Sequence, residues 1–172
     1  LNKSNIYDLI EYKDEFSKTI PSIFIPTTHG TASEVTMWGT IWNMKEKKKY
    51  SISNHSLYHS LAILDGSITL TLPMDISITT VMDALSHSFE SIWNKNSNLT
   101  STNFAIEAIS LIFQNIKALK NNPQDKKIRN QLLLASNKAG LAFSNTKTAA
   151  AHSISYPLTI HYNIPHGIAS SL

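Results

Sequence analysis

The sequence of 172 residues contains no cysteine, so it offers neither a disulfide framework nor a thiolate that could ligate a metal. No apolar run approaches the roughly 20 residues that a helix needs to span a bilayer. The first residues lack the apolar segment of a signal peptide, and they also lack an initiator methionine. These absences fit a reducing compartment, and we expect a cytoplasmic protein without a membrane partner.

Glycine is scarce and dispersed. The five glycines include no adjacent pair and no G-x-G arrangement, so the glycine-rich turn that holds pyrophosphate in dinucleotide folds is missing. The formal net charge is only +3, and much of it comes from one lysine cluster, which argues against a nucleic-acid partner. A hydrophobic content of 42% and a charged content of 16% are those of a globular protein.

Strand-like patterns occur only in the first half of the chain. Residues 22–25 and 61–65 resemble short buried strands, and residues 36–43 with 47–52 predict a β-hairpin. Helical patterns cover residues 4–16 and dominate from about residue 76. Later helices are expected from Thr79 or Thr80, from Thr100 or Ser101 through Leu119, from Pro123 to Phe143, and from about Thr146 to Pro157. This order predicts an α/β part over residues 1–75 and an all-α part over residues 76–172.

Four side chains are candidate ligands of one metal ion. Asp83 and His87 are four residues apart, so on a helix they share a face, and both lie in an apolar run. His152 and His166 follow, fourteen residues apart, with prolines between them that require the chain to turn. An Asp-x-x-x-His pair alone is more often a hydrogen-bonded pair, but charged groups on a buried face need partners. One carboxylate and three imidazoles suit Fe²⁺ or Zn²⁺.

Three motifs carry a family resemblance. The stretches Ile25 to Thr36, Met82 to His87 and Pro165 to Gly167 resemble three signatures of iron-containing alcohol dehydrogenases, in the same order. The resemblance runs from about residue 20 to the end of the chain. It implies a dinucleotide-binding α/β domain packed on a helical metal domain, with the active site between them, and a homodimer. It also implies that this chain is the middle of a longer protein, incomplete at both ends.

The resemblance implies an oxidoreductase that interconverts a short alcohol and aldehyde with NAD or NADP. Its cofactor side would be formed by the hydroxyl-rich loop and hairpin, namely Thr27, Thr28, Thr31, Thr36 and Lys49. Without the resemblance, such a loop is usually only a turn. Tyr156 stands where relatives often have a histidine, and it could donate a proton there. His29 stands where relatives usually have a small residue, so it could alter the cofactor contact, whereas His55, His59 and His161 resemble ordinary surface histidines.

Residues 90–96, 142–149 and 152–158 resemble the phosphonate-associated branch of the family. That branch implies substrates such as phosphonoacetaldehyde and 2-hydroxyethylphosphonate. Two other hypotheses remain: a metal-dependent lyase similar to dehydroquinate synthase, and a truncated, non-catalytic fragment that still binds metal. Since the family's glycine-rich phosphate loop lies upstream of residue 1, we expect the 172 residues alone to be unable to turn over substrate.

Overall fold

The computed structural model describes residues 20–172, so the helix expected over residues 4–16 lies outside the described part. Short strands and 3₁₀ turns come first, and helices follow from Met74 onward, in the predicted order. The 3₁₀ turns are η1 (Ser33–Val35), η2 (His55–Leu57) and η3 (Gly66–Thr69). The loops of the first part pack onto the helices, so the two parts meet through many contacts.

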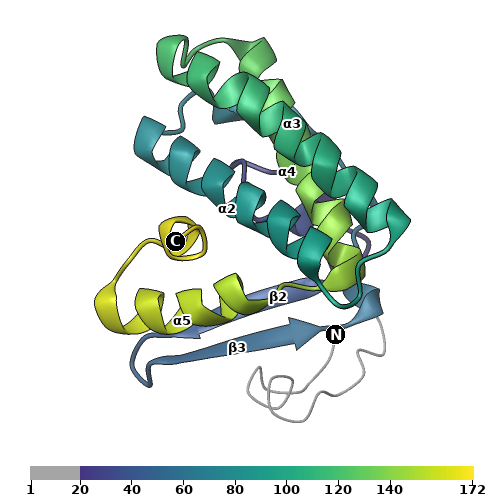
Figure 1. Ribbon diagram of the computed structural model, residues 1–172, viewed down its shortest axis with the longest axis vertical. Coiled ribbons are helices and arrows are strands. Elements are labelled where there is room, and N and C mark those ends of the chain that lie inside the picture. The colour runs from purple at the N-terminus through teal and green to yellow at the C-terminus, as the bar shows by residue number, and fades with distance from the viewer. Residues whose placement is uncertain (1–19) are drawn as a thin grey trace.

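The described strands form two small sheets. The hairpin is confirmed: β2 (Trp38–Asn43) pairs antiparallel with β3 (Lys48–Ser53). In the second sheet β1 (Ile23–Phe24) pairs parallel with β4 (Leu61–Ala62). The hairpin places Lys49 opposite Trp42, and it extends beneath α5 in Figure 1.

The prediction that the strands near Ile23 and Leu61 are buried was wrong. Ile23 is 60% exposed and Leu61 is 51% exposed. Parallel strands are normally covered on both faces, and their apolar runs reflect that burial. In the described part the β1–β4 pair has no third strand, so its apolar side chains face solvent.

The helical part of the described chain forms a bundle with two smaller elements beside it. Its helices are α2 (Met74–Trp93), α3 (Leu99–Asn121), α4 (Lys126–Thr146), α5 (Ala150–Tyr162) and the short α6 (His166–Ala169). Figure 1 shows α2, α3 and α4 side by side, with α5 lying over the hairpin and the C-terminus beside α2. None of the described helices has the length and apolar character that crossing a membrane requires.

Two helix starts depend on caps that are visible in the sequence. Asn98 and Ser101 form a capping box at the start of α3, and Asp125 accepts hydrogen bonds from two backbone N–H groups of α4. The predicted start of α2 at Thr79 or Thr80 was wrong, because α2 begins at Met74. The Thr80 hydroxyl instead donates to the carbonyl of Ser77 within the helix.

The prediction that a helix ends near Pro157 was also wrong. A proline inside a helix removes one backbone donor and normally breaks it. Here α5 continues through Pro157 to Tyr162, and its last turn buries Ile160. The chain turns instead at Asn163, whose φ of 55° is left-handed, and it enters α6 through Pro165.

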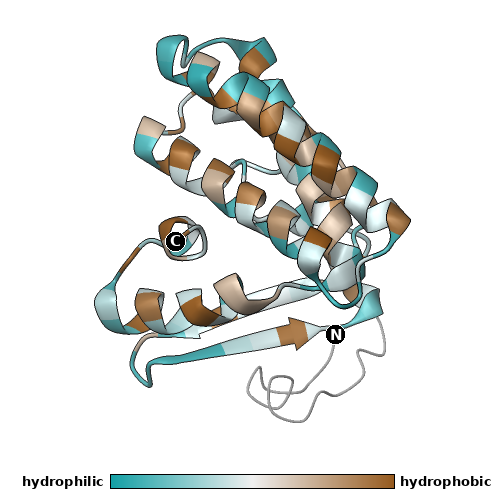
Figure 2. Cartoon of the chain, in the orientation of Figure 1, coloured by the Kyte–Doolittle hydropathy of each residue, from teal (hydrophilic) through white to brown (hydrophobic). Residues whose placement is uncertain are grey.

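A core between α2, α3 and α4 fixes the helix that carries the first two candidate ligands. Hydrophobic residues recur along all three helices (Figure 2). The buried cluster consists of Val81, Ala84, Ala108, Ile112, Leu119, Leu132, Ala135 and Ala139. Burial of each larger aliphatic side chain contributes about 1.5–3 kcal/mol, and the alanines allow close helix approach.

Two glycines let other segments approach α2 closely. A Cβ on Gly30 would lie 2.7 Å from the carbonyl oxygen of Thr80. A Cβ on Gly167 would collide with the carbonyl oxygen of Thr79. The absence of side chains therefore lets the loop before η1 and the start of α6 meet α2 near Asp83.

Candidate metal centre

Asp83 and His87 lie one turn apart on α2, on the face that points away from the helical core. Both are buried, with 4% and 6% of their surfaces exposed. The Nδ1 atom of His87 lies 4.0 Å from Oδ2 of Asp83. The helical spacing therefore places a carboxylate and an imidazole together in a nearly dry environment.

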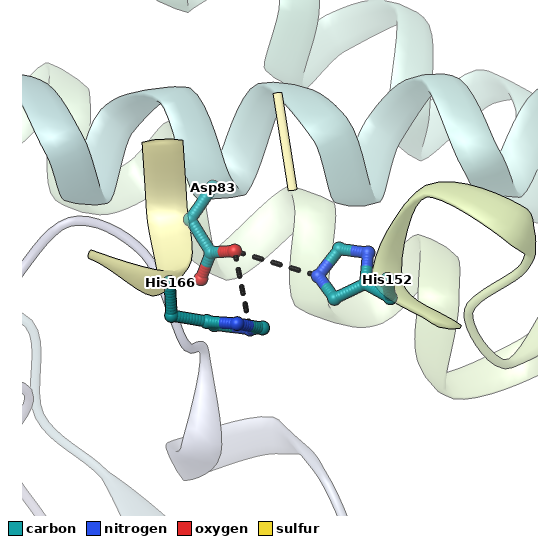
Figure 3. Close-up of side chains that lie close together, drawn as sticks. All are labelled: Asp83, His152 and His166. Atoms are coloured by element: carbon teal, nitrogen blue, oxygen red, sulfur yellow. Dashed lines mark ion pairs between the residues drawn. The ribbon is translucent and has the colours of Figure 1, made fainter. Parts of the chain in front are cut away.

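Two further elements bring histidines to Asp83. Figure 3 shows His152, from the first turn of α5, and His166, from the start of α6, both directed at the carboxylate of Asp83. Nε2 of His152 lies 3.4 Å from Oδ1 of Asp83, and Nε2 of His166 lies 3.8 Å from the same oxygen. One potential ligand atom from each of the three residues lies within 4.8 Å of the others.

His87 lies beside this group rather than within it. Its ring stacks on His152, with centroids 4.2 Å apart, and on Phe143, with centroids 4.1 Å apart. Within the described part, His87 Nδ1 and His152 Nε2 are buried nitrogens without a hydrogen-bond partner. Unpaired buried polar atoms are costly, so this pair marks a place built for a further partner.

Glu90 holds His152 in position. Its Oε2 lies 2.6 Å from Nδ1 of His152, and its Oε1 accepts a hydrogen bond of 3.2 Å from the backbone N–H of the same residue. Glu90 is fully buried on α2, three residues after His87. A carboxylate that accepts from Nδ1 leaves the lone pair of Nε2 directed at Asp83.

Two other residues support the group. The Ser170 hydroxyl donates to Oδ1 of Asp83 at 3.0 Å, and the Ser155 hydroxyl lies 3.3 Å from Nδ1 of His166. Among Ser86, Ser153 and Ser155, only the Ser155 side chain contacts a candidate ligand. Ser86 donates to a backbone carbonyl of residue 170, and Ser153 donates to one of residue 149.

Electrostatics favour an ionised carboxylate among imidazoles. Burial raises the pKa of Asp83, but His87, His152 and His166 together lower it by more than burial raises it. The pKa of Asp83 therefore lies well below its usual value. Burial lowers the pKa of His87 to about 4 and lowers that of His166. Burial also acts on His152, but Asp83 and Glu90 outweigh it and raise its pKa to about 8.

These groups line one cleft of about 580 Å³ between the hairpin, the loop before η1 and the helices. Thr31, Thr36 and Lys49, which the family resemblance assigned to the cofactor side, also line it. Thr27 and Thr28 are not among its lining residues. His87, His152, His166 and Asp83 occupy the helical wall of the same cleft.

Lys49 and Tyr156 meet beside the metal-binding candidates. The ammonium of Lys49 lies 3.2 Å from the centroid of the Tyr156 ring, and that ring stacks on His166 at 5.8 Å. Burial lowers the pKa of Lys49 to about 8 and raises the pKa of Tyr156. The hairpin thus brings a cation to the candidate metal site.

Comparison with known proteins identifies the family. The profile described as Fe-containing alcohol dehydrogenase family, C-terminal, matches residues 77–172, and the profile described as iron-containing alcohol dehydrogenase matches residues 1–66. The chain belongs to the iron-containing alcohol dehydrogenase family. The predicted fold class, an α/β part followed by an all-α part, is confirmed by solved members of this family.

Three relatives show how much of a family member this chain spans. Sulfoacetaldehyde reductase from Bifidobacterium kashiwanohense, solved in complex with NAD⁺, matches with a TM-score of 0.93 and 35% identity over 98% of this chain and 45% of that one. Long-chain-alcohol dehydrogenase 1 from Geobacillus thermodenitrificans is 35% identical over 90% of this chain and 39% of that protein. 4-Hydroxybutyrate dehydrogenase from Clostridium kluyveri is 34% identical over 96% of this chain and 45% of that protein. The chain therefore spans less than half the length of these relatives.

The residues present fit the divalent ion that the family name implies. The donor set of one carboxylate with imidazoles suits Fe²⁺ and Zn²⁺ equally. The unpaired nitrogens of His87 and His152 face the carboxylate of Asp83. Asp83, His152 and His166 form the compact part of the site, with His87 adjoining it.

Sequence reasoning missed Glu90 and Ser170 as supports of the site. Glu90 lies seven residues after Asp83, and this helical spacing was a signal that it shares the same face. Ser170 gave no signal, because its contact depends on how α6 docks onto α2.

Two histidines differ from the sequence-based expectation. His59 was predicted to be an ordinary surface residue, but it stacks on Phe24 with centroids 3.4 Å apart and bonds to Ser22 and to the carbonyl of Ser33. His29 was expected to alter the cofactor contact. It is buried with its Nε2 on the Thr69 hydroxyl, and it does not line the cleft.

Proposed function

We propose that the protein containing this chain is a metal-dependent oxidoreductase that interconverts a short alcohol and aldehyde with NAD or NADP. The observation that carries the proposal is the buried group of Asp83, His152 and His166, adjoined by His87, opening into the cleft that Lys49 and Thr31 also line. Because the chain spans less than half of its relatives, the activity belongs to the whole protein. We further propose that Asp83, His87, His152 and His166 hold one Fe²⁺ or Zn²⁺ ion.

A divalent ion held there would supply Lewis-acid chemistry at the oxygen of an alcohol or aldehyde, and a bound nicotinamide would supply hydride transfer. The chain's own residues set the charge, the protonation and the access of water at this site. Asp83 stays ionised, and Glu90 keeps a proton on Nδ1 of His152, which leaves Nε2 free to ligate. Phe143 stacks on the His87 ring and on Trp38, and this aromatic wall limits water beside the ligands.

Tyr156 is our candidate for the group that holds the reacting proton. Its ring lies between the Lys49 ammonium and His166, and it faces the cleft. Thr31, Thr36 and Lys49 would contact the dinucleotide from the opposite wall, and Thr27 and Thr28 from the loop before it.

For the substrate we propose a short aldehyde that carries an acid group. The names of two relatives include a short compound that carries an acid group: the aldehyde sulfoacetaldehyde and the alcohol 4-hydroxybutyrate. The resemblance of residues 142–149 and 152–158 to the phosphonate-associated branch supports phosphonoacetaldehyde as a candidate. The lyase alternative is less favoured, because its sites favour glutamate with several lysines and arginines, whereas the candidate ligands here are one aspartate and histidines.

The remaining expectations stay predictions: a homodimer, a cytoplasmic location, and a division of the chain at residues 75 and 76. The division falls within the first turn of α2, at the point where short strands and loops give way to helices.

The test uses the full-length protein loaded with Fe²⁺ or Zn²⁺. Oxidation of NADH is followed with phosphonoacetaldehyde, sulfoacetaldehyde and butyraldehyde. Asp83→Asn should abolish turnover and metal retention, whereas Asp75→Asn, on the exposed face of the same helix, should leave both intact. Turnover by Asp83→Asn at the rate of the unchanged protein would refute the proposal.

A further inference from the structure

Among the described residues, the charges that line the cleft are unbalanced toward positive. Lys49 and Lys147 line it, and Asp83 is its only acidic lining residue. Asp83 is buried among the imidazoles, so its charge serves the metal site. Beyond the metal site the cleft therefore offers two ammonium groups and no carboxylate, which suits an anionic ligand.

Lys147 has a backbone conformation that few side chains tolerate. Its φ of 67° and ψ of 176° fall in a region occupied almost only by glycine. The conformation is fixed on both sides: its N–H donates to the carbonyl of Phe143 at 2.7 Å, and its carbonyl accepts from Asn94 at 3.2 Å. A glycine would adopt this conformation without strain, so the presence of a lysine indicates that its side chain has a task.

The Lys147 side chain is exposed, and within the described part it has no ion pair or hydrogen bond. Its neighbour Thr148 lines the same cleft as Tyr156, and the ring of Tyr156 stacks on His166. Lys147 therefore lines the cleft directly next to Thr148, on the side of the cleft that Tyr156 and the metal-binding candidate His166 also line. Lys49 differs, because its ammonium already lies on the face of the Tyr156 ring.

We propose that Lys147 is the residue that recognises the anionic end of the substrate, a sulfonate, phosphonate or carboxylate on a short aldehyde. The inference rests on the oxidoreductase proposed above and deepens it. The aldehyde end lies toward Asp83 and the histidines, and the acid end lies toward the ammonium of Lys147. Neutral aldehydes make only the first of these contacts, so Lys147 determines specificity without taking part in the chemistry.

The first experiment measures specificity in the full-length, metal-loaded protein. Lys147→Met should lower kcat/KM for phosphonoacetaldehyde, sulfoacetaldehyde or succinic semialdehyde by about tenfold to a hundredfold, as expected for one hydrogen bond to a charged group. The value for neutral butyraldehyde and the Kd of NADH should not change. Lys127→Met removes the same charge at the opposite, exposed end of α4 and should affect none of these values.

Two further variants separate binding from folding. Lys147→Arg should retain most of the preference for anionic aldehydes. Lys147→Gly removes the backbone strain, so its Tm should be unchanged or higher, and it should still lose the preference. A loss of preference that appears only together with a lower Tm would overturn the assignment.

Other possible outcomes would also contradict the proposed role of Lys147. Equal losses for butyraldehyde and the anionic aldehydes would show that Lys147 does not discriminate, and a weaker Kd for NADH alone would assign it to the phosphates of the dinucleotide. Titration with methylphosphonate, methanesulfonate and acetate needs no turnover, so it tests Lys147 even if the proposed reaction fails. Equal anion binding by the unchanged protein and by Lys147→Met would refute the inference. The relative affinities of the three anions show which acid group the site prefers.

Discussion

Replacing Glu90 with glutamine changes one buried carboxylate into an amide of the same shape. The carboxylate accepts from Nδ1 of His152 at 2.6 Å and from the backbone N–H of the same residue at 3.2 Å. An amide has only one accepting oxygen, so one of the two donors loses its partner. If the NH₂ group faces the ring, His152 must accept through Nδ1 and carry its proton on Nε2, the atom that should ligate the metal.

Substitution of such a support of a metal-ligating histidine lowers metal affinity by about 10–100-fold, which corresponds to about 1.4–2.8 kcal/mol. We therefore expect Glu90→Gln in the full-length protein to raise the Kd of Zn²⁺ by this factor, measured by competition with a chelator. Glu107→Gln, an exposed glutamate on α3, is the matched control and should leave the Kd unchanged. If Glu90→Gln binds Zn²⁺ as tightly as the control, Glu90 does not set the tautomer of His152, and the reasoning is refuted.

Four further predictions concern the same cleft. His166→Ala should lower metal stoichiometry in elemental analysis, whereas exposed His161→Ala should not; equal metal content in both would remove His166 from the site. Lys49→Ala should raise KM for the dinucleotide more than KM for the aldehyde, and equal changes in steady-state kinetics would contradict its assignment to the cofactor. The pKa of His152 is raised to about 8, so the metal must displace a proton from it below that pH, and metal affinity should rise as pH approaches 8 and then level off. The same raised pKa stabilises the metal-free fold below pH 6.5 and ceases to do so as pH rises through 8, which denaturant titrations of the metal-free protein would detect; stability that rises over that range would contradict it.

The local parts of the fold were predictable because their signals lie close together in the sequence. Alternation over residues 36–43 with the polar turn before residues 47–52 predicted the hairpin, and Pro123 marked the break between α3 and α4. The exposure of the β1–β4 pair was not predictable, because an apolar run does not reveal whether other strands or helices cover it. The helix α5 continues through Pro157 against the local rule that proline ends a helix, and its last turn buries Ile160.

The candidate ligands were predictable for a similar reason, and their supports were not. Asp83 and His87 share a helical period, and His152 and His166 stand out as histidines in apolar or turn contexts. Ser170 contacts Asp83 across 87 positions of sequence, so only the docking of α6 onto α2 reveals it. Lys147 lies within residues 142–149, which resemble the phosphonate-associated branch, but its unusual φ is a property of the folded backbone and could not be predicted.

The glycine of the Pro-His-Gly motif shows how packing and ligation depend on each other in this site. In the sequence Gly167 is only the residue after a candidate ligand. In the structure any side chain there would collide with the carbonyl oxygen of Thr79, one turn before Asp83 on α2. Since His166 and Gly167 are adjacent, the close approach that glycine permits is what brings the imidazole to within 3.8 Å of the carboxylate. The motif therefore encodes a helix contact as much as a ligand, and the ligand could not reach Asp83 without the contact.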